Sequence, residues 1–126
     1  MPIAFAVDPG DRIRVASFTG TVTDADLIEA YATLVADPAY RPELNDLADL
    51  TLVGRVEVSS EALQRLISMY APIDALKVPT RLAIVAPIDL TYGISRMYEL
   101  LRGDDVPEEV CVFRDLGEAR AWLGAA

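Results

Sequence analysis

Short runs of β-forming residues alternate along this chain with longer segments whose apolar residues recur every three or four positions. The β-type runs are residues 3–7, 12–18, 46–53, 81–86 and 109–114. The helical segments begin near residues 24, 60, 89 and 116. Strands that are separated by helices need crossover connections, which build a mostly parallel sheet with helices packed on it. The order of elements therefore predicts an α/β fold.

The first two runs predict an antiparallel pair of strands. Between them stands Asp8-Pro9-Gly10-Asp11, a sequence typical of a tight turn. We therefore expect a five-stranded mixed sheet, with an N-terminal antiparallel hairpin followed by parallel βα units, and four main helices. Residues 53–58 would form an extra loop before the second helix. The 126 residues, of which 52% are hydrophobic, suit a single domain over residues 1–126.

Apolar stripes predict which side of each helix faces the sheet. The third helix would turn inward Leu90, Ile94, Met97, Tyr98 and Leu101. The last helix would bury Leu116, Ala119, Trp122 and Leu123. The run 81–86 is almost entirely apolar, which predicts a strand in the middle of the sheet with both faces covered.

The charge balance and the missing residue types exclude several functions. With 20 acidic residues against 11 basic ones, the net charge of −9 repels phosphate backbones and anionic lipids, so we expect no nucleic-acid partner. The absence of histidine removes the usual general base of hydrolases and the imidazole metal ligand. We therefore expect neither an enzyme nor a bound cofactor or metal.

Cysteine use and hydropathy indicate a cytoplasmic protein. Cys111 is the one cysteine, and its place between two valines predicts a buried, structural thiol. The first residues lack the basic start of a signal peptide. No apolar run approaches the roughly 20 residues that a membrane-spanning helix needs.

Several stretches resemble the SpoIIAA-like proteins, small bacterial domains with the STAS type of fold that are also compared with the CRAL-TRIO (SEC14) lipid-binding fold. The resemblance covers nearly the whole chain and is clearest in residues 82–87, 92–99 and 112–123, and in the segments 37–42 and 45–51. It implies a STAS-type α/β domain.

The resemblance also implies a phosphorylation site at Ser59 or Ser60. In STAS proteins that act as anti-sigma factor antagonists, a partner kinase phosphorylates a serine at the start of the helix after the third core strand. These two serines occupy the matching place, although Val58-Ser-Ser-Glu61 replaces the Asp-Ser-Ser-Gly of that pattern. A serine there can equally serve only as a helix N-cap.

The carboxyl ends of the strands form the default binding place of an open α/β sheet. This predicts a pocket near Thr51, Ser59, Pro87 and Tyr92. The carboxylates of Asp46 and Asp49 are three residues apart on one strand, so they point to opposite faces and are not expected to form a catalytic pair.

The start of the third helix carries a second candidate feature. A glycine early in a helix costs about 1 kcal/mol relative to alanine, so Gly93 indicates a close approach by a ligand or by a packed neighbour. Arg96 could hold an anionic group beside the ring of Tyr92. The alternative is that Arg96 pairs at the surface with Glu99 or Glu61.

Three hypotheses of function follow. The first is a non-enzymatic regulatory or protein-interaction module. Such a module could form a homodimer through its helix faces or its edge strand. The second is a carrier of a small lipophilic or anionic amphipathic ligand in a cleft between the second and third long helices, lined by Met69, Tyr70, Ile73, Leu90, Ile94 and Met97. The third is an enzyme that uses Asp49, Ser59 and Arg96. The residues predicted to bind a ligand are Thr51, Tyr70, Pro87, Tyr92, Gly93, Arg96 and Met97.

Overall fold

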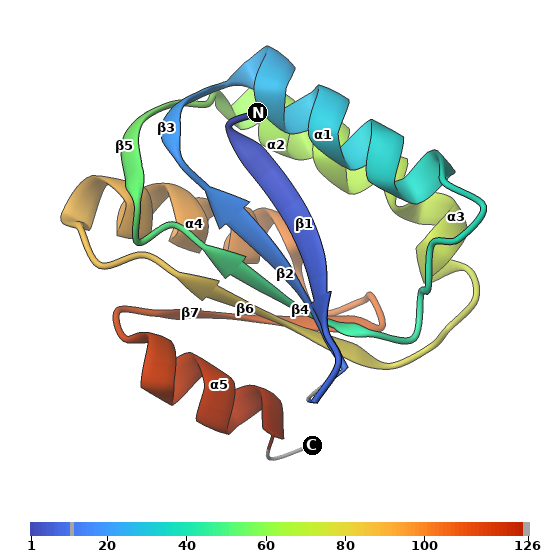
Figure 1. The fold of residues 1–126 in the computed structure, drawn as a ribbon. Coiled ribbons are helices and arrows are strands. Elements are labelled where there is room, and N and C mark those ends of the chain that lie inside the picture. The colour runs from blue at the N-terminus through green and yellow to red at the C-terminus, as the bar shows by residue number, and fades with distance from the viewer. Residues whose placement is uncertain (11, 125–126) are drawn as a thin grey trace.

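The computed structural model describes residues 1–10 and 12–124 and has a five-stranded mixed sheet at its centre (Figure 1). Its strands, in spatial order, are β1 (Ile3–Asp8), β2 (Ile13–Phe18), β4 (Asn45–Asp49), β6 (Thr80–Val85) and β7 (Glu108–Phe113). β1 and β2 are antiparallel, and every other neighbouring pair is parallel. The predicted mixed sheet with its N-terminal hairpin is therefore confirmed. The apolar strand β6 lies inside the sheet as expected, although the central strand is β4.

Helices cover both faces of the sheet, which explains why β6 is apolar from Leu82 to Val85. The helices are α1 (Asp24–Ala36), α2 (Ser60–Met69), α3 (Ala71–Asp74), α4 (Asp89–Arg102) and α5 (Leu116–Gly124). Figure 1 shows α1 and α2 on one side of the sheet and α5 on the other. Ala48 and Ile84 belong to the core under α1, α2 and α4, whereas Leu47 and Ala83 belong to the core under α5. This alternation is the two-residue period of a strand.

A second, two-stranded parallel sheet pairs β3 (Gly20–Thr23) with β5 (Val53–Glu57). The sequence prediction of one strand over 46–53 and a loop over 53–58 is wrong here. β4 ends at Asp49, whose carboxylate accepts a hydrogen bond from the Thr51 amide at 2.9 Å, and the chain turns. Val22 and Val53 are then buried in the core, which accounts for the pairing of these short strands.

The C-terminal helix and the last strand are less buried than their sequence predicts. Trp122 is half-buried, with its ring 5.6 Å from that of Phe113 and 4.9 Å from the Arg81 guanidinium. Leu116 is exposed, while Ala119 and Leu123 are buried as expected. Cys111 is half-buried rather than buried, and its partial burial raises the pKa of its thiol.

Helix α4 is rotated relative to the orientation that its apolar stripe predicts. Its buried side chains are Thr91, Ser95, Tyr98 and Arg102. Leu90, Met97 and Leu101 are exposed by 66%, 40% and 39%, so of the five side chains predicted to face inward only Tyr98 is buried and Ile94 half-buried. The buried hydroxyls of Thr91 and Ser95 donate to backbone carbonyls one turn earlier, at 3.1 and 2.7 Å. These bonds make burial of a polar helix face possible.

The guanidinium of Arg102 explains the rotation of α4. It donates two hydrogen bonds to Asp74, at 2.6 and 2.8 Å, and one to Glu108, at 3.2 Å. The arginine side chain is 1% exposed. A charge buried this deeply is tolerated only where partners surround it, and here α3 and β7 supply them. The rotation that pairs Arg102 leaves the leucines of α4 in solvent.

We predict that Arg102→Ala lowers the free energy of unfolding by about 3–5 kcal/mol, because it leaves two carboxylates unpaired in a buried place. The matched control is Arg96→Ala, which breaks an exposed pair with Glu99 on the same helix and should cost no more than about 1 kcal/mol. Urea denaturation of both variants measures the difference. Equal losses in the two variants would contradict the account of α4.

Candidate functional site

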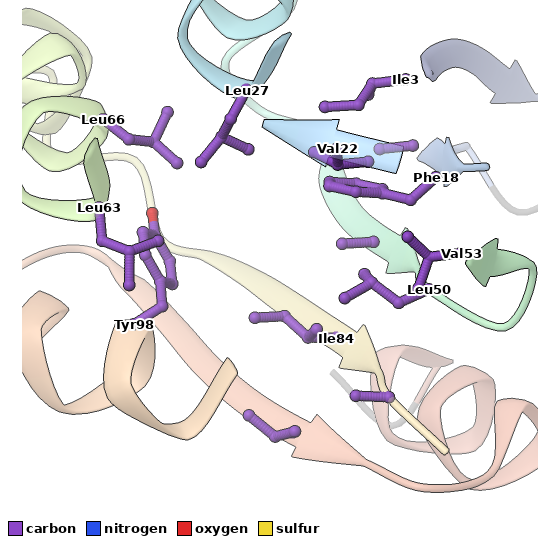
Figure 2. Packing of buried hydrophobic residues seen from close by; sticks show 14 of the residues in the cluster. Ile3, Phe18, Val22, Leu27, Leu50, Val53, Leu63, Leu66, Ile84 and Tyr98 are labelled. Atoms are coloured by element: carbon purple, nitrogen blue, oxygen red, sulfur yellow. The ribbon is translucent and has the colours of Figure 1, made fainter. Parts of the chain in front are cut away.

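A cavity of about 90 Å³ lies between the sheet and helices α1, α2 and α4. Its wall is mostly apolar, with side chains from both sheets and from these helices that include Phe18, Leu27, Leu63, Leu66 and Ile84. Figure 2 shows these five side chains within the main hydrophobic core. An apolar cavity of about 150 Å³ can hold benzene. The space here therefore suits a short aliphatic molecule rather than a large one.

One end of the cavity is polar, because two strands bring carboxylates to it. Asp46 on β4 is aligned with Leu82 on β6, which is aligned with Val110 on β7. Glu108 stands two residues before Val110 and so points to the same face of the sheet as Asp46. Both carboxylates line the cavity, together with the tyrosines 31, 70 and 98.

Buried arginines neutralise part of this acidic end. Arg14, which is 4% exposed and aligned with Asp46 across β2 and β4, donates to that carboxylate at 2.9 Å. Its guanidinium also donates to the carbonyl of Arg41 and lies 4.4 Å from the centre of the Tyr40 ring. Glu108 is held by Arg102, as described above. The polar groups thus form two arginine–carboxylate clusters at the border of the cavity.

Burial changes the ionisation of these groups. It raises the pKa of Asp46 to about 7, although the neighbouring Arg14 acts in the opposite direction. Burial also raises the pKa of Glu108, against the attraction of Arg102. The pKa values of the Tyr31, Tyr70 and Tyr98 hydroxyls are raised as well, mainly by burial, so these hydroxyls remain protonated at neutral pH. The end of the cavity therefore combines neutral phenols with carboxylates.

A smaller hollow adjoins this polar end. Its volume is about 10 Å³, and it shares Asp46, Tyr70 and Glu108 with the cavity. Tyr40 and Asp74 lie on its other sides. The carboxylates therefore stand between the apolar space and a second, polar one.

Of the residues predicted to bind a ligand, Tyr70 lines the cavity. Thr51 and Pro87 are exposed at the carboxyl end of the strands, where Leu50 donates to the Val85 carbonyl at 2.9 Å. Arg114 joins Pro87 and Tyr92: it donates to the Pro87 carbonyl at 3.1 Å and lies 4.2 Å from the Tyr92 ring centre. A ligand site at this edge stays a prediction.

Gly93, Arg96 and Met97 lie on the outer side of α4, away from the cavity. A β-carbon placed on Gly93 would meet no atom within 4 Å, so no packed neighbour requires a glycine there. Arg96 pairs with Glu99 at 2.8 Å, as the alternative interpretation expected. In the cleft predicted for a carrier, Ile94 lines the cavity and Ile73 lines the smaller hollow, whereas Leu90 is exposed and Met69 packs against the core.

Ser59 is the N-cap of α2, and its hydroxyl accepts a hydrogen bond from the Ala62 amide at 3.2 Å. Both its amide and its hydroxyl donate to Asp24 at 2.7 Å, and these bonds lower the pKa of that carboxyl. Ser60 is the exposed first residue of the helix. Phosphorylation of either serine stays a prediction.

The three side chains of the enzyme hypothesis each have other partners. Asp49 accepts from the Thr51 amide, Ser59 donates to Asp24, and Arg96 pairs with Glu99.

Within residues 1–10 and 12–124, no group of three or more cysteine or acidic side chains could hold a metal ion. In the same part of the chain, no helix has the length and hydrophobicity to cross a membrane.

We predict that the raised pKa of Asp46 makes stability fall as the pH rises. Below pH 3.8, the ordinary pKa of an aspartate, Asp46 is protonated in both the folded and the unfolded protein. Between pH 3.8 and about 7 the unfolded protein has lost this proton while the folded protein still holds it, so raising the pH favours unfolding. The free energy of unfolding of the wild type, compared with that of Asp46→Asn, should therefore decrease from pH 4 to pH 7. Denaturant titrations at several pH values measure it, and two parallel pH profiles would contradict the assignment.

Comparisons with known proteins identify the fold. No family model matches the chain, and no curated protein matches it. Among solved structures it is similar to an uncharacterized protein of the DUF3478 family with a SpoIIAA-like fold, from Shewanella loihica PV-4. The TM-score is 0.60 and the sequence identity 21%, over 96% of this chain and 91% of that one. The relation to the CRAL-TRIO fold stays a prediction, but the resemblance in fold is confirmed: this chain has a SpoIIAA-like fold.

Proposed function

We propose that this protein is a non-enzymatic binding module that takes a small, mainly apolar molecule into the cavity between the sheet and helices α1, α2 and α4. The observation that carries the proposal is the 90 Å³ space inside the main core. Protein interiors are normally packed as densely as organic crystals, and an unfilled volume costs stability. A binding role gives this space a reason to persist.

The composition of the wall supports the same proposal. Ligand sites are typically apolar with a few polar groups that orient the ligand. Here the carboxylates of Asp46 and Glu108 lie at one end, while leucine, isoleucine, valine, alanine and phenylalanine side chains form most of the remainder. A ligand would be held by burial of its apolar part and oriented by its polar part.

Two buried alanines on opposite faces of the sheet provide a test. Ala48 on β4 lines the cavity, whereas Ala83 on β6 packs under α5. We predict that xenon, a neutral apolar probe, binds the wild type. The Ala48→Leu variant should stay stably folded but bind no xenon, because the leucine side chain fills the space. In Ala83→Leu the larger side chain enters a core that is already filled, which should lower the free energy of unfolding by about 1–3 kcal/mol. Xenon binding should persist in this variant, because the cavity is unchanged.

Xenon-induced chemical-shift changes and urea denaturation measure the two effects. Failure of the wild type to bind xenon, or equal binding by both variants, would contradict the proposed cavity function. A larger loss of stability in Ala48→Leu than in Ala83→Leu would also contradict it, because it would show that Ala48 faces filled space.

A protein-interaction module is a second candidate, favoured by the outer side of α4. Leu90 and Leu100 are exposed by 66% and 72%, beside the partly exposed Met97 and Leu101. Arg96 and Glu99 neutralise each other next to this stripe, which limits the repulsion between two copies of net charge −9 at this surface. The partner that fits this surface is a second copy of the chain.

We predict that the wild type sediments as a dimer and that Leu100→Glu sediments as a monomer, because the new carboxylate would be buried without a partner in the interface. Leu76→Glu, which changes another exposed leucine outside α4, should remain dimeric. Analytical ultracentrifugation distinguishes the masses. A monomeric wild type, or a dimeric Leu100→Glu, would rule out this surface.

A further inference from the structure

A tyrosine hydroxyl at the cavity lacks a partner among the described residues. Tyr98 is 7% exposed and its side chain lines the cavity. No hydrogen bond within residues 1–10 and 12–124 engages its hydroxyl, and since no enclosed side-chain oxygen in that part of the chain lacks a partner, this oxygen faces accessible space. Figure 2 shows its oxygen directed toward the side chains of Leu63 and Leu66 on α2. A hydroxyl that faces accessible space can donate and accept hydrogen bonds. The Tyr98 hydroxyl therefore offers a place for the polar group of a ligand.

The carboxylates at the same end have spare acceptor capacity. Asp46 binds Arg14 through Oδ1, and Glu108 binds Arg102 through Oε1. Within the described residues, no hydrogen bond engages the second oxygen of either group. A carboxylate can accept about four hydrogen bonds, so both groups could accept more from a ligand.

The two arginines at this end already have hydrogen-bond partners. Arg14 donates to Asp46 and to a backbone carbonyl, and Arg102 donates to Asp74 and Glu108. These two arginines face three carboxylates, those of Asp46, Asp74 and Glu108. When all five groups are ionised, one negative charge is left without a cationic partner. A ligand with a carboxylate or phosphate would increase this excess, whereas a cationic group would remove it.

The surrounding rings also suit a cation. The rings of Tyr31 and Tyr70 both line the cavity, with centroids 6.5 Å apart. The face of a tyrosine ring attracts an ammonium group, most strongly where water is excluded. An ammonium group carries three donors and no acceptor, which matches two carboxylates and one phenolic oxygen.

We propose that the molecule bound in this cavity is a short-chain primary amine. Its ammonium group would lie among Asp46, Glu108 and Tyr98, and its alkyl chain against the apolar wall of the cavity. The inference rests on the proposed cavity function and adds the chemical class of the ligand. The volume of about 90 Å³ limits the alkyl chain to a few carbon atoms.

The test compares three probes that share a four-carbon chain: n-butylammonium chloride, n-butanol and sodium butyrate. Each is titrated into the protein at constant ionic strength and about pH 8, where Asp46, with its pKa of about 7, is mostly ionised and the amine is still protonated. Binding is followed by chemical-shift changes of the Leu63, Leu66 and Ile84 methyl groups. We expect n-butylammonium to bind about tenfold more tightly than n-butanol, the difference that charge-assisted hydrogen bonds supply. Sodium butyrate should cause no saturable change.

Variants then assign the preference to the polar end. Glu108→Gln should reduce the amine-to-alcohol affinity ratio about tenfold, and Tyr98→Phe should weaken amine binding several-fold. The matched control is Glu109→Gln, which makes the same change at the next residue, 66% exposed on the other face of β7, and should leave the ratio unchanged. If Glu108→Gln does not fold, Tyr98→Phe answers the question, because it removes only the unpartnered hydroxyl.

The possible outcomes separate this inference from the proposed function. Equal affinity for amine and alcohol, tighter binding of butyrate, or an unchanged ratio in both Glu108→Gln and Tyr98→Phe would overturn the amine inference and leave the cavity function intact. Absence of binding by n-butylammonium, n-butanol and xenon would overturn both.

Discussion

The buried guanidinium of Arg102 joins α4 to two elements that are distant from one another in the sequence, α3 through Asp74 and β7 through Glu108. These ion pairs require the arginine to face inward, and the helical period then buries Tyr98, Ser95 and Thr91 on the same side. The same rotation places leucines in solvent. One interaction therefore determines both the polar groups near the cavity and the apolar stripe outside α4.

The cavity depends on the same arrangement. Short or small side chains such as Ala48 and Ser95 face the space from the sheet and from α4, so the large side chains of α1 and α2 do not fill it. Arg14 and Arg102 hold the two carboxylates at one end, where burial keeps their pKa values high. A bundle of leucines in place of Thr91, Ser95 and Arg102 would give a denser core and no polar end.

Much of this fold could be predicted from the sequence, because strand and helix periods along the chain reflect burial. The hairpin, the three parallel strands and the four long helices are marked by apolar runs, turn residues and helix caps, which locate each element even where the buried face or the end differs. The strands β3 and β5 could not be found in this way, because each is short and contains an exposed glycine, and the partner of each lies far away in the sequence.

The candidate site was harder to predict, since its main residues are charged ones that pattern analysis assigns to the surface. Arg14 and Arg102 are buried because carboxylates from other elements meet them. The pairing of α4 with Asp74 and Glu108 depends on tertiary contacts, and its apolar stripe favoured the opposite rotation. Two signals were present: Thr91, Ser95, Tyr98 and Arg102 share helical spacing, and Arg14 alternates with the apolar residues of its strand.

The orientation of α4 is the central claim, and a measurement of side-chain exposure tests it most directly. In a protein with labelled leucine and methionine methyl groups, a paramagnetic agent dissolved in the buffer broadens the NMR signals of exposed methyls. The structure predicts strong broadening for Leu90 and Leu100, comparable with that of the exposed Leu52, and little for Leu63 and Leu66. Protection of Leu90, Met97 and Leu101 would show that the helix buries its apolar stripe instead, and would contradict the account.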